Sequence, residues 1–113
     1  MKKYQLGEFE EIVMLTVGVL YNDAYGVSIK KEIEDRLKRA VSVGALQSAL
    51  TRLEDKGYLH SHEGETTQAR AGRPKRYFVI TALGKRALEH SKSIRDDLWK
   101  SIPKIALNVK ITG

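Results

Sequence analysis

The order of its apolar patterns is the feature that most constrains this chain. Three short segments carry apolar residues at the three- and four-residue spacing of amphipathic helices, and two segments expected to be strands follow them, the second of which is rich in aromatic and β-branched residues. A longer helical pattern over residues 82–102 completes the order helix, helix, helix, strand, strand, helix. This order predicts a mainly α (α+β) chain with the winged helix-turn-helix fold and a long C-terminal helix.

Each of the first three helical patterns predicts one buried face. The residues expected on these faces are Phe9, Ile12, Val13, Val17, Leu20 and Tyr21 in the first helix, Ile29, Ile33 and Leu37 in the second, and Leu46, Leu50 and Leu53 in the third. Ser42 is expected to cap the third helix, and Gly57 is expected to end it in a left-handed conformation.

The two strands are predicted over residues 58–64 and 75–81, where they form a hairpin, the wing. Residues 64–74 are polar and contain two glycines and a proline, so they are expected to form an exposed loop. Thr81 is a candidate cap for the last helix. Pro103 should end that helix, because proline lacks an amide donor and obstructs the preceding turn.

Composition limits the chemistry that this chain of 113 residues can perform. It has no cysteine, which excludes disulfides, thiol catalysis and cysteine-bound zinc, and it has no apolar run of membrane-spanning length. The first eleven residues carry acids where a signal peptide needs an apolar stretch, so a cytoplasmic location is expected. The net charge of +6 favours a polyanionic partner, with nucleic acid first and an anionic membrane surface second.

Four cations gather at the wing, with no acid among them: Arg70, Arg73, Lys75 and Arg76. In a winged helix-turn-helix protein they would lie against DNA phosphates, and the strands behind them would hold them in register. The alternative is a solvated basic loop that keeps an edge strand from pairing with another chain.

The third helix carries small and polar residues opposite its leucines. Gly44, Ser48, Thr51 and Asp55 lie on the far side, and Gln47 and Arg52 flank them. The candidate DNA-binding residues of this segment are Ser42, Gln47, Ser48, Thr51 and Arg52. Gln can pair with adenine and Arg with guanine in the major groove. An ordinary solvent-exposed face is the alternative for each of them.

The last helix has two apolar stripes about 100° apart, one with Leu83, Ala87, Ile94 and Leu98 and the other with Leu88, Arg95 and Trp99. A helix of about 20 residues extends roughly 30 Å, further than a small domain can cover, so a second copy is the expected partner. Trp99 either packs in that dimer interface or forms one wall of an effector pocket between the subunits, and packing is favoured. The residues expected at this interface or pocket are Leu88, Ile94, Arg95, Leu98 and Trp99.

Other chemistry has little support in the sequence. His60 and His62 alternate on a predicted strand and could share a metal with Glu63 or Glu65, although exposed histidines are the better explanation. His90 is expected to be a partly buried structural residue. No glycine-rich phosphate loop or nucleophile–base motif is present, so neither an enzyme nor a bound cofactor or metal is expected.

Four segments make the chain resemble the PadR-like transcriptional regulators: LGEFEEIVML (6–15), YGVSIKKEIE (25–34), SVGALQSALTRLEDKGYL (42–59) and GRPKRYFVITALGKRAL (72–88). Members of this family usually have Tyr-Pro where this chain has Gln47 and Ser48. The resemblance implies a bacterial or archaeal repressor that forms a homodimer through its C-terminal helix and binds an inverted-repeat operator. Some members release DNA when they bind aromatic or drug-like compounds, and this chain resembles the short-tailed subgroup.

The sequence therefore predicts a winged helix-turn-helix DNA-binding domain over residues 1–81, and a C-terminal dimerisation helix and tail over residues 82–113 that pack as one unit with it. The expected function is sequence-specific regulation of transcription. The alternatives are a winged-helix RNA-binding protein and a protein-interaction module that has the fold but does not bind DNA.

Overall fold

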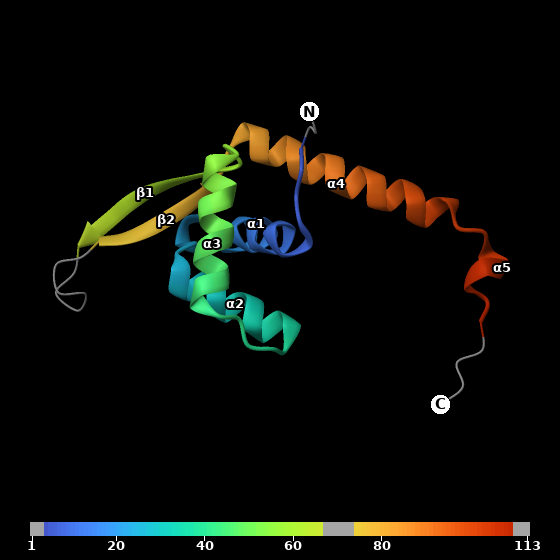
Figure 1. Cartoon of the computed structure of the whole chain (residues 1–113), viewed down its shortest axis with the longest axis horizontal. Helices are drawn as coiled ribbons and strands as arrows, with labels where there is room; N and C mark the ends of the chain where they lie inside the picture. The colour runs from blue at the N-terminus through green and yellow to red at the C-terminus, as the bar shows by residue number, and fades with distance from the viewer. Residues whose placement is uncertain (1–3, 67–73, 110–113) are drawn as a thin grey trace.

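A computed structural model describes residues 4–66 and 74–109 of the chain. Along the chain lie α1 (Glu8–Leu20), η1 (Tyr21–Asp23), α2 (Gly26–Leu37), α3 (Val43–Asp55), β1 (Leu59–Thr66), β2 (Pro74–Ile80), α4 (Ala82–Ser101) and α5 (Lys104–Leu107) (Figure 1). The predicted order of helices and strands is confirmed. The short helices η1 and α5 were not predicted.

The first three helices enclose the core with the faces that their apolar spacing predicts. The fully buried side chains include Val13, Met14, Val17, Ile29, Ile33, Leu46, Leu50 and Leu53. Two residues assigned to these faces lie elsewhere. Tyr21 is 74% exposed, because α1 ends at Leu20 and the chain turns there with a positive φ at Tyr21. Leu37 is also exposed, since it is the last residue of α2 and lies beyond the core.

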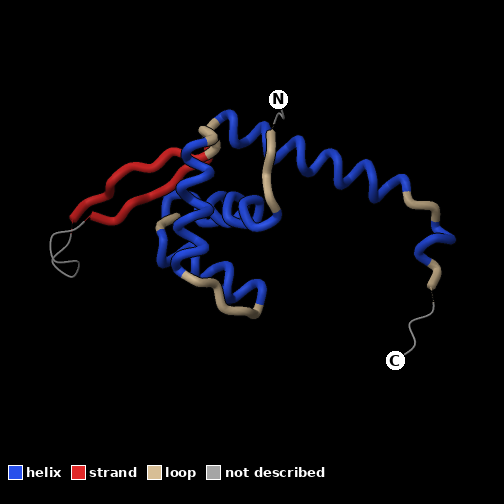
Figure 2. The backbone as a smooth tube through the Cα atoms, viewed as in Figure 1, coloured by secondary structure: helices blue, strands red, loops and turns tan. Residues whose placement is uncertain are grey.

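The wing is an antiparallel hairpin in which Leu59 pairs with Ile80 and Glu63 with Arg76 (Figure 2). The predicted loop over residues 64–74 was too long, because β1 continues to Thr66 and β2 begins at Pro74. A polar hairpin end lacks the apolar alternation by which strands are predicted, so its strand character was missed. The amide of Phe78 donates to the carbonyl of Ala24, 2.8 Å away, which joins the hairpin to the helical body.

Local signals set the ends of the helices as predicted. The Ser42 hydroxyl accepts a hydrogen bond from the amide of Ala45 and begins α3, and the Thr81 hydroxyl accepts one from the amide of Gly84 and begins α4. Gly57 has a φ of 79°, a left-handed conformation that L-residues rarely adopt. Helix α4 ends at Ser101, two residues before Pro103.

Helix α4 begins against the core and then leaves it. Gly84 and Ala87 are buried, whereas Leu98 is 63% and Trp99 67% exposed. The hairpin and the outer half of α4 project in opposite directions from the helical body (Figure 1). The radius of gyration is 17.3 Å, against about 13 Å for a compact chain of this length. This difference reflects how far α4 and the hairpin extend beyond the body.

His90 is exposed on α4, not partly buried as expected, and its ring lies 5.4 Å from that of Tyr4. The apolar stripe beside it is covered only near Ala87, so a residue one turn further along is already at the surface. Within residues 4–66 and 74–109, no helix is long and apolar enough to cross a membrane.

Candidate nucleic-acid interface

Helix α3 presents four polar side chains side by side on the surface. Its leucines face the core, so the helical period turns Gln47, Ser48, Thr51 and Arg52 outward, where they line one shallow depression. Ser42 is also exposed at the start of α3, but its hydroxyl already accepts the capping hydrogen bond from Ala45. The four depression residues carry the donors and acceptors that base edges require.

The turn between α2 and α3 is held by a carboxylate. Oε2 of Glu34 accepts a hydrogen bond from the amide of Val41 at 2.8 Å and another from Nζ of Lys30 at 2.9 Å. The hydrogen bond from the Val41 amide, supported by that from Lys30, holds the pKa of Glu34 below its usual value. This contact links α2 to the residue that precedes the cap of α3. It joins residues seven positions apart through a turn, a spacing that carries no periodic signal.

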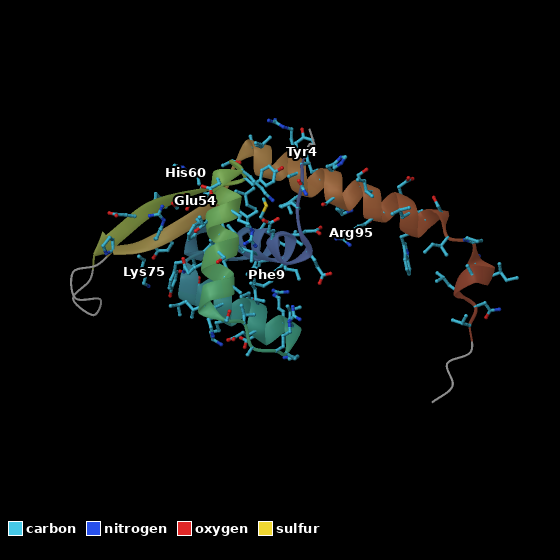
Figure 3. All side chains as sticks on the ribbon, viewed as in Figure 1. Tyr4, Phe9, Glu54, His60, Lys75 and Arg95 are labelled. Atoms are coloured by element: carbon cyan, nitrogen blue, oxygen red, sulfur yellow. The ribbon has the colours of Figure 1, made fainter. Side chains whose placement is uncertain are left out.

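Two of the predicted wing cations lie in the first residues of β2, toward the end of the hairpin that is furthest from the Leu59–Ile80 pair, and each contacts the helical body. Nζ of Lys75 lies 4.2 Å from the centroid of the Tyr25 ring, and Nη2 of Arg76 lies 3.6 Å from Oε1 of Glu54 on α3 (Figure 3). Glu54 also accepts a hydrogen bond from Oγ of Ser61 on β1. The wing and α3 are therefore linked through Glu54. The other two predicted cations, Arg70 and Arg73, lie outside the described residues.

A groove of about 310 Å³ lies where the first turn of α2, the N-terminal half of α3 and the start of β2 meet. Its lining residues are Tyr25, Gly26, Val27, Lys30, Val43, Leu46, Gln47, Pro74, Lys75, Arg76 and Phe78. In the described part of the chain this lining has three cations and no acid. Two of these cations, Lys30 and Arg76, are also paired with Glu34 and Glu54 outside the lining. A cation-lined groove beside an exposed polar helix suits the phosphate backbone of a nucleic acid.

Arg52 has a partner that the sequence did not reveal. Its Nε donates to Oε2 of Glu10, 3.0 Å away, in a contact that joins α3 to the first turn of α1. The two residues are 42 positions apart, and neither helical periodicity nor a local motif connects them. The predicted reader residue is thus held within the protein by a carboxylate.

Comparison with known protein families decides the assignment of this fold. The family model described as "Transcriptional regulator PadR-like family" matches residues 14–90, about two-thirds of the chain. The chain belongs to the PadR-like family. The resemblance inferred from the sequence is confirmed, and the winged helix-turn-helix is the fold of this PadR-like regulator.

Solved structures agree with this assignment. A PadR-like transcription factor from Bacteroides fragilis is 26% identical with a TM-score of 0.70, and the match covers 86% of this chain and 88% of the other. A transcriptional regulator from Clostridium thermocellum is 25% identical with a TM-score of 0.66, covering 89% and 92%. A PadR-like regulator from Bacillus cereus, at 17% identity and a TM-score of 0.71, covering 90% and 93%, shares the fold. Comparison with curated proteins found no match.

Membership of the family makes this protein a transcriptional regulator, and family membership implies that it acts through DNA binding. PadR-like proteins are transcription factors and not enzymes, as the sequence predicted. For the histidines of the wing, the described residues contain no group of three or more His, Cys, Asp or Glu side chains that could hold a metal ion.

The residues predicted for a dimer interface or effector pocket differ in burial and in contacts along α4. Leu88 packs partly buried against the core of its own chain, and Arg95 pairs with Glu11 of α1 at 2.7 Å. Ile94, Leu98 and Trp99 remain exposed on the outer half of the helix. Of the five predicted residues, these three have apolar side chains that a partner could cover.

Proposed function

We propose that this PadR-like regulator is a repressor that binds an inverted-repeat operator as a homodimer. The observation that carries the proposal is the position of the polar face of α3 next to a cation-lined groove between α2, α3 and the start of β2. Such a surface offers base-reading and phosphate-binding groups from one side of the molecule.

The two kinds of contact come from different elements. Gln47, Ser48, Thr51 and Arg52 are proposed to meet base edges, since α3 presents them together and its leucines anchor it from behind. The phosphate contacts are proposed to come from Ser42, Arg70, Arg73, Lys75 and Arg76. In this chain Gln47 and Ser48 stand where the family usually has Tyr-Pro, so the bases that α3 reads should differ from those read by typical members.

Dimerisation is proposed to occur through the outer half of α4. The exposed Ile94, Leu98 and Trp99 would be covered by the same surface of a second copy, as a two-fold interface requires. In this arrangement residues 1–81 form the DNA-binding unit, and residues 82–113 join two such units. The recognition helices would then reach successive major grooves about 34 Å apart on one face of the duplex.

Release by a small molecule belongs to the same proposal. Trp99 is a large aromatic side chain at the surface that would lie between the subunits of the dimer, where it packs or forms one wall of a pocket. An aromatic or drug-like molecule that binds there would change the distance between the two recognition helices and thereby weaken operator binding.

The test begins with a footprint of the purified protein on the DNA upstream of its own gene, which defines the operator. Gln47→Ala and Arg52→Ala should then each reduce the preference for the operator over random duplex by about tenfold, because one good base contact is worth roughly 1–3 kcal/mol of discrimination. Equal losses on both duplexes would show that these residues touch only the backbone. Competition with structured RNA separates this function from RNA binding.

A further inference from the structure

Glu10 is a buried carboxylate that lies behind the recognition surface. Its side chain is only 7% exposed, and it accepts hydrogen bonds from the amide of Gly7 at 2.8 Å, from Nζ of Lys56 at 2.9 Å and from Nε of Arg52 at 3.0 Å. Burial by itself raises the pKa of Glu10, but the hydrogen bonds from Gly7, Lys56 and Arg52 together lower it below its usual value. Glu10 is therefore an anion at neutral pH, with donors on several sides.

The bond to Arg52 uses the nitrogen nearest the chain. A guanidinium that donates through Nε still has two terminal amino groups, and these are the groups that pair with O6 and N7 of guanine or with a phosphate. The side chain of Arg52 is 53% exposed beside Ser48 and Thr51 in the depression on α3. Its inner end is fixed while its outer end faces solvent.

We infer that Glu10 is a positioning residue for operator recognition, which holds Arg52 by Nε so that the terminal amino groups are presented to one base pair. This inference rests on the proposed function. The physical reason is preorganisation: an arginine has a large rotamer entropy, and a side chain already held in its bound conformation loses less of that entropy on binding. Lys56 completes the arrangement, because its Nζ also donates to the carbonyl of Gln5 and so fixes the segment that precedes α1.

Charge and positioning predict effects of opposite sign, which makes the inference testable. Removal of an anion close to the DNA surface strengthens binding to every duplex through Coulomb attraction. Removal of a positioning contact weakens only the preference of the protein for its operator. The ratio of operator affinity to random-duplex affinity therefore isolates the positioning effect, because a general gain cancels in the ratio.

The experiment compares Glu10→Gln with Glu8→Gln, which removes the same charge from an exposed position in the same turn of α1. Affinities for fluorescent operator and random duplexes are measured at one salt concentration, after circular dichroism has shown that each variant is folded. Glu10→Gln should lower the affinity ratio by about threefold to tenfold, and Glu8→Gln should leave it unchanged. In an Arg52→Ala background, Glu10→Gln should cause no further change in the ratio.

An unchanged ratio in folded Glu10→Gln would overturn the inference, and so would an equal fall in the Arg52→Ala background, because Glu10 would then act without Arg52. If Glu10→Gln does not fold, the affinity ratio of Arg52→Lys tests the inference instead. A lysine keeps the charge but has one side-chain nitrogen, so it cannot be held at an inner nitrogen while it pairs with a base through two outer ones. The affinity ratio of Arg52→Lys should therefore fall as far as that of Arg52→Ala. An affinity ratio equal to that of the wild type would overturn the inference. A wild-type protein with no operator preference would instead refute the proposed function.

Discussion

Nη2 of Arg95 lies 2.7 Å from Oε1 of Glu11, so α4 is tied to α1 of the same chain before its exposed outer end (Figure 3). The Glu11 side chain is only 12% exposed, which strengthens an ion pair that would be weak at the surface. Together with the close approach of Gly84 to Tyr58 and the packing of Ala87 and Leu88 against the core, this pair attaches α4 to the body. We expect these contacts together to set the direction of α4 relative to the body.

The Glu11–Arg95 pair should contribute measurably to stability. A double-mutant cycle with Glu11→Gln and Arg95→Met, measured by urea unfolding, should give a coupling free energy of about 1 kcal/mol. The same cycle on Lys92 and Asp96, an exposed pair on the same helix, should give a smaller coupling. Equal coupling free energies for the two pairs would mean that the burial of Glu11 does not strengthen its ion pair with Arg95.

Two helical glycines should respond oppositely to alanine. A Cβ at Gly84 would lie 2.2 Å from the carbonyl oxygen of Tyr58, a backbone atom that cannot move aside, so Gly84→Ala should destabilise the fold by about 1–3 kcal/mol. A Cβ at Gly44 meets nothing within 4 Å, so Gly44→Ala should stabilise it by about 0.5 kcal/mol. Thermal unfolding of both variants checks the signs. Destabilisation in both would mean that helix position, and not the contact with Tyr58, determines the response.

The wing cations should act through charge alone. Replacement of Arg73, Lys75 and Arg76 by alanine should weaken binding to all duplexes alike, and each phosphate that is no longer neutralised should reduce the slope of log affinity against log salt by about 0.9. Arg76 is paired with Glu54, so Arg76 should contribute less to the slope than Lys75 does. Titrations of the protein with duplex DNA over a range of salt concentrations measure the slope, with Lys92→Ala as the control. An unchanged slope in the folded triple variant would exclude the wing from phosphate binding.

The outer half of α4 should determine the oligomeric state. Leu98→Glu with Trp99→Glu would place two charges in the proposed interface, so the protein should sediment as a folded monomer and lose tight operator binding, because two linked sites bind far more strongly than one. Glutamates at Ser93 and Lys100, on the polar side of the same helix, serve as the control, and they add even more negative charge than the test variant does. A double variant that stays dimeric, or a monomer that binds the operator undiminished, would refute this interface.

Acid should loosen the turn before α3. The pKa of Glu34 is lower in the folded protein than in the unfolded chain, so its stabilising effect is fully present above the unfolded value, near 4.5, and is lost as the pH falls through the folded value. The melting temperature should therefore fall less between about pH 5 and pH 2 in Glu34→Gln than in the wild type. Glu8→Gln is the control. A parallel pH profile in Glu34→Gln would show that this carboxylate does not link folding to pH.

The sequence by itself determined the elements and their order. Leucines at helical spacing predicted the buried face of α3, and single residues such as Ser42, Gly57 and Thr81 set helix ends, because caps and turns depend on neighbours a few positions away. It also predicted which polar residues of α3 lie at the surface. Where no local signal existed, as at the polar end of the hairpin, the predicted boundary was wrong by two residues in β1 and by one in β2.

Only the tertiary structure decided which charges meet. Glu10 holds Arg52 across 42 residues, and Glu11 holds Arg95 across 84, although both glutamates look like ordinary acids in the first turn of a helix. Such pairs depend on how α1 packs against α3 and α4, and packing is set by the whole core and not by spacing along the chain. A long side chain can reach several partners, and the position of the backbone selects one.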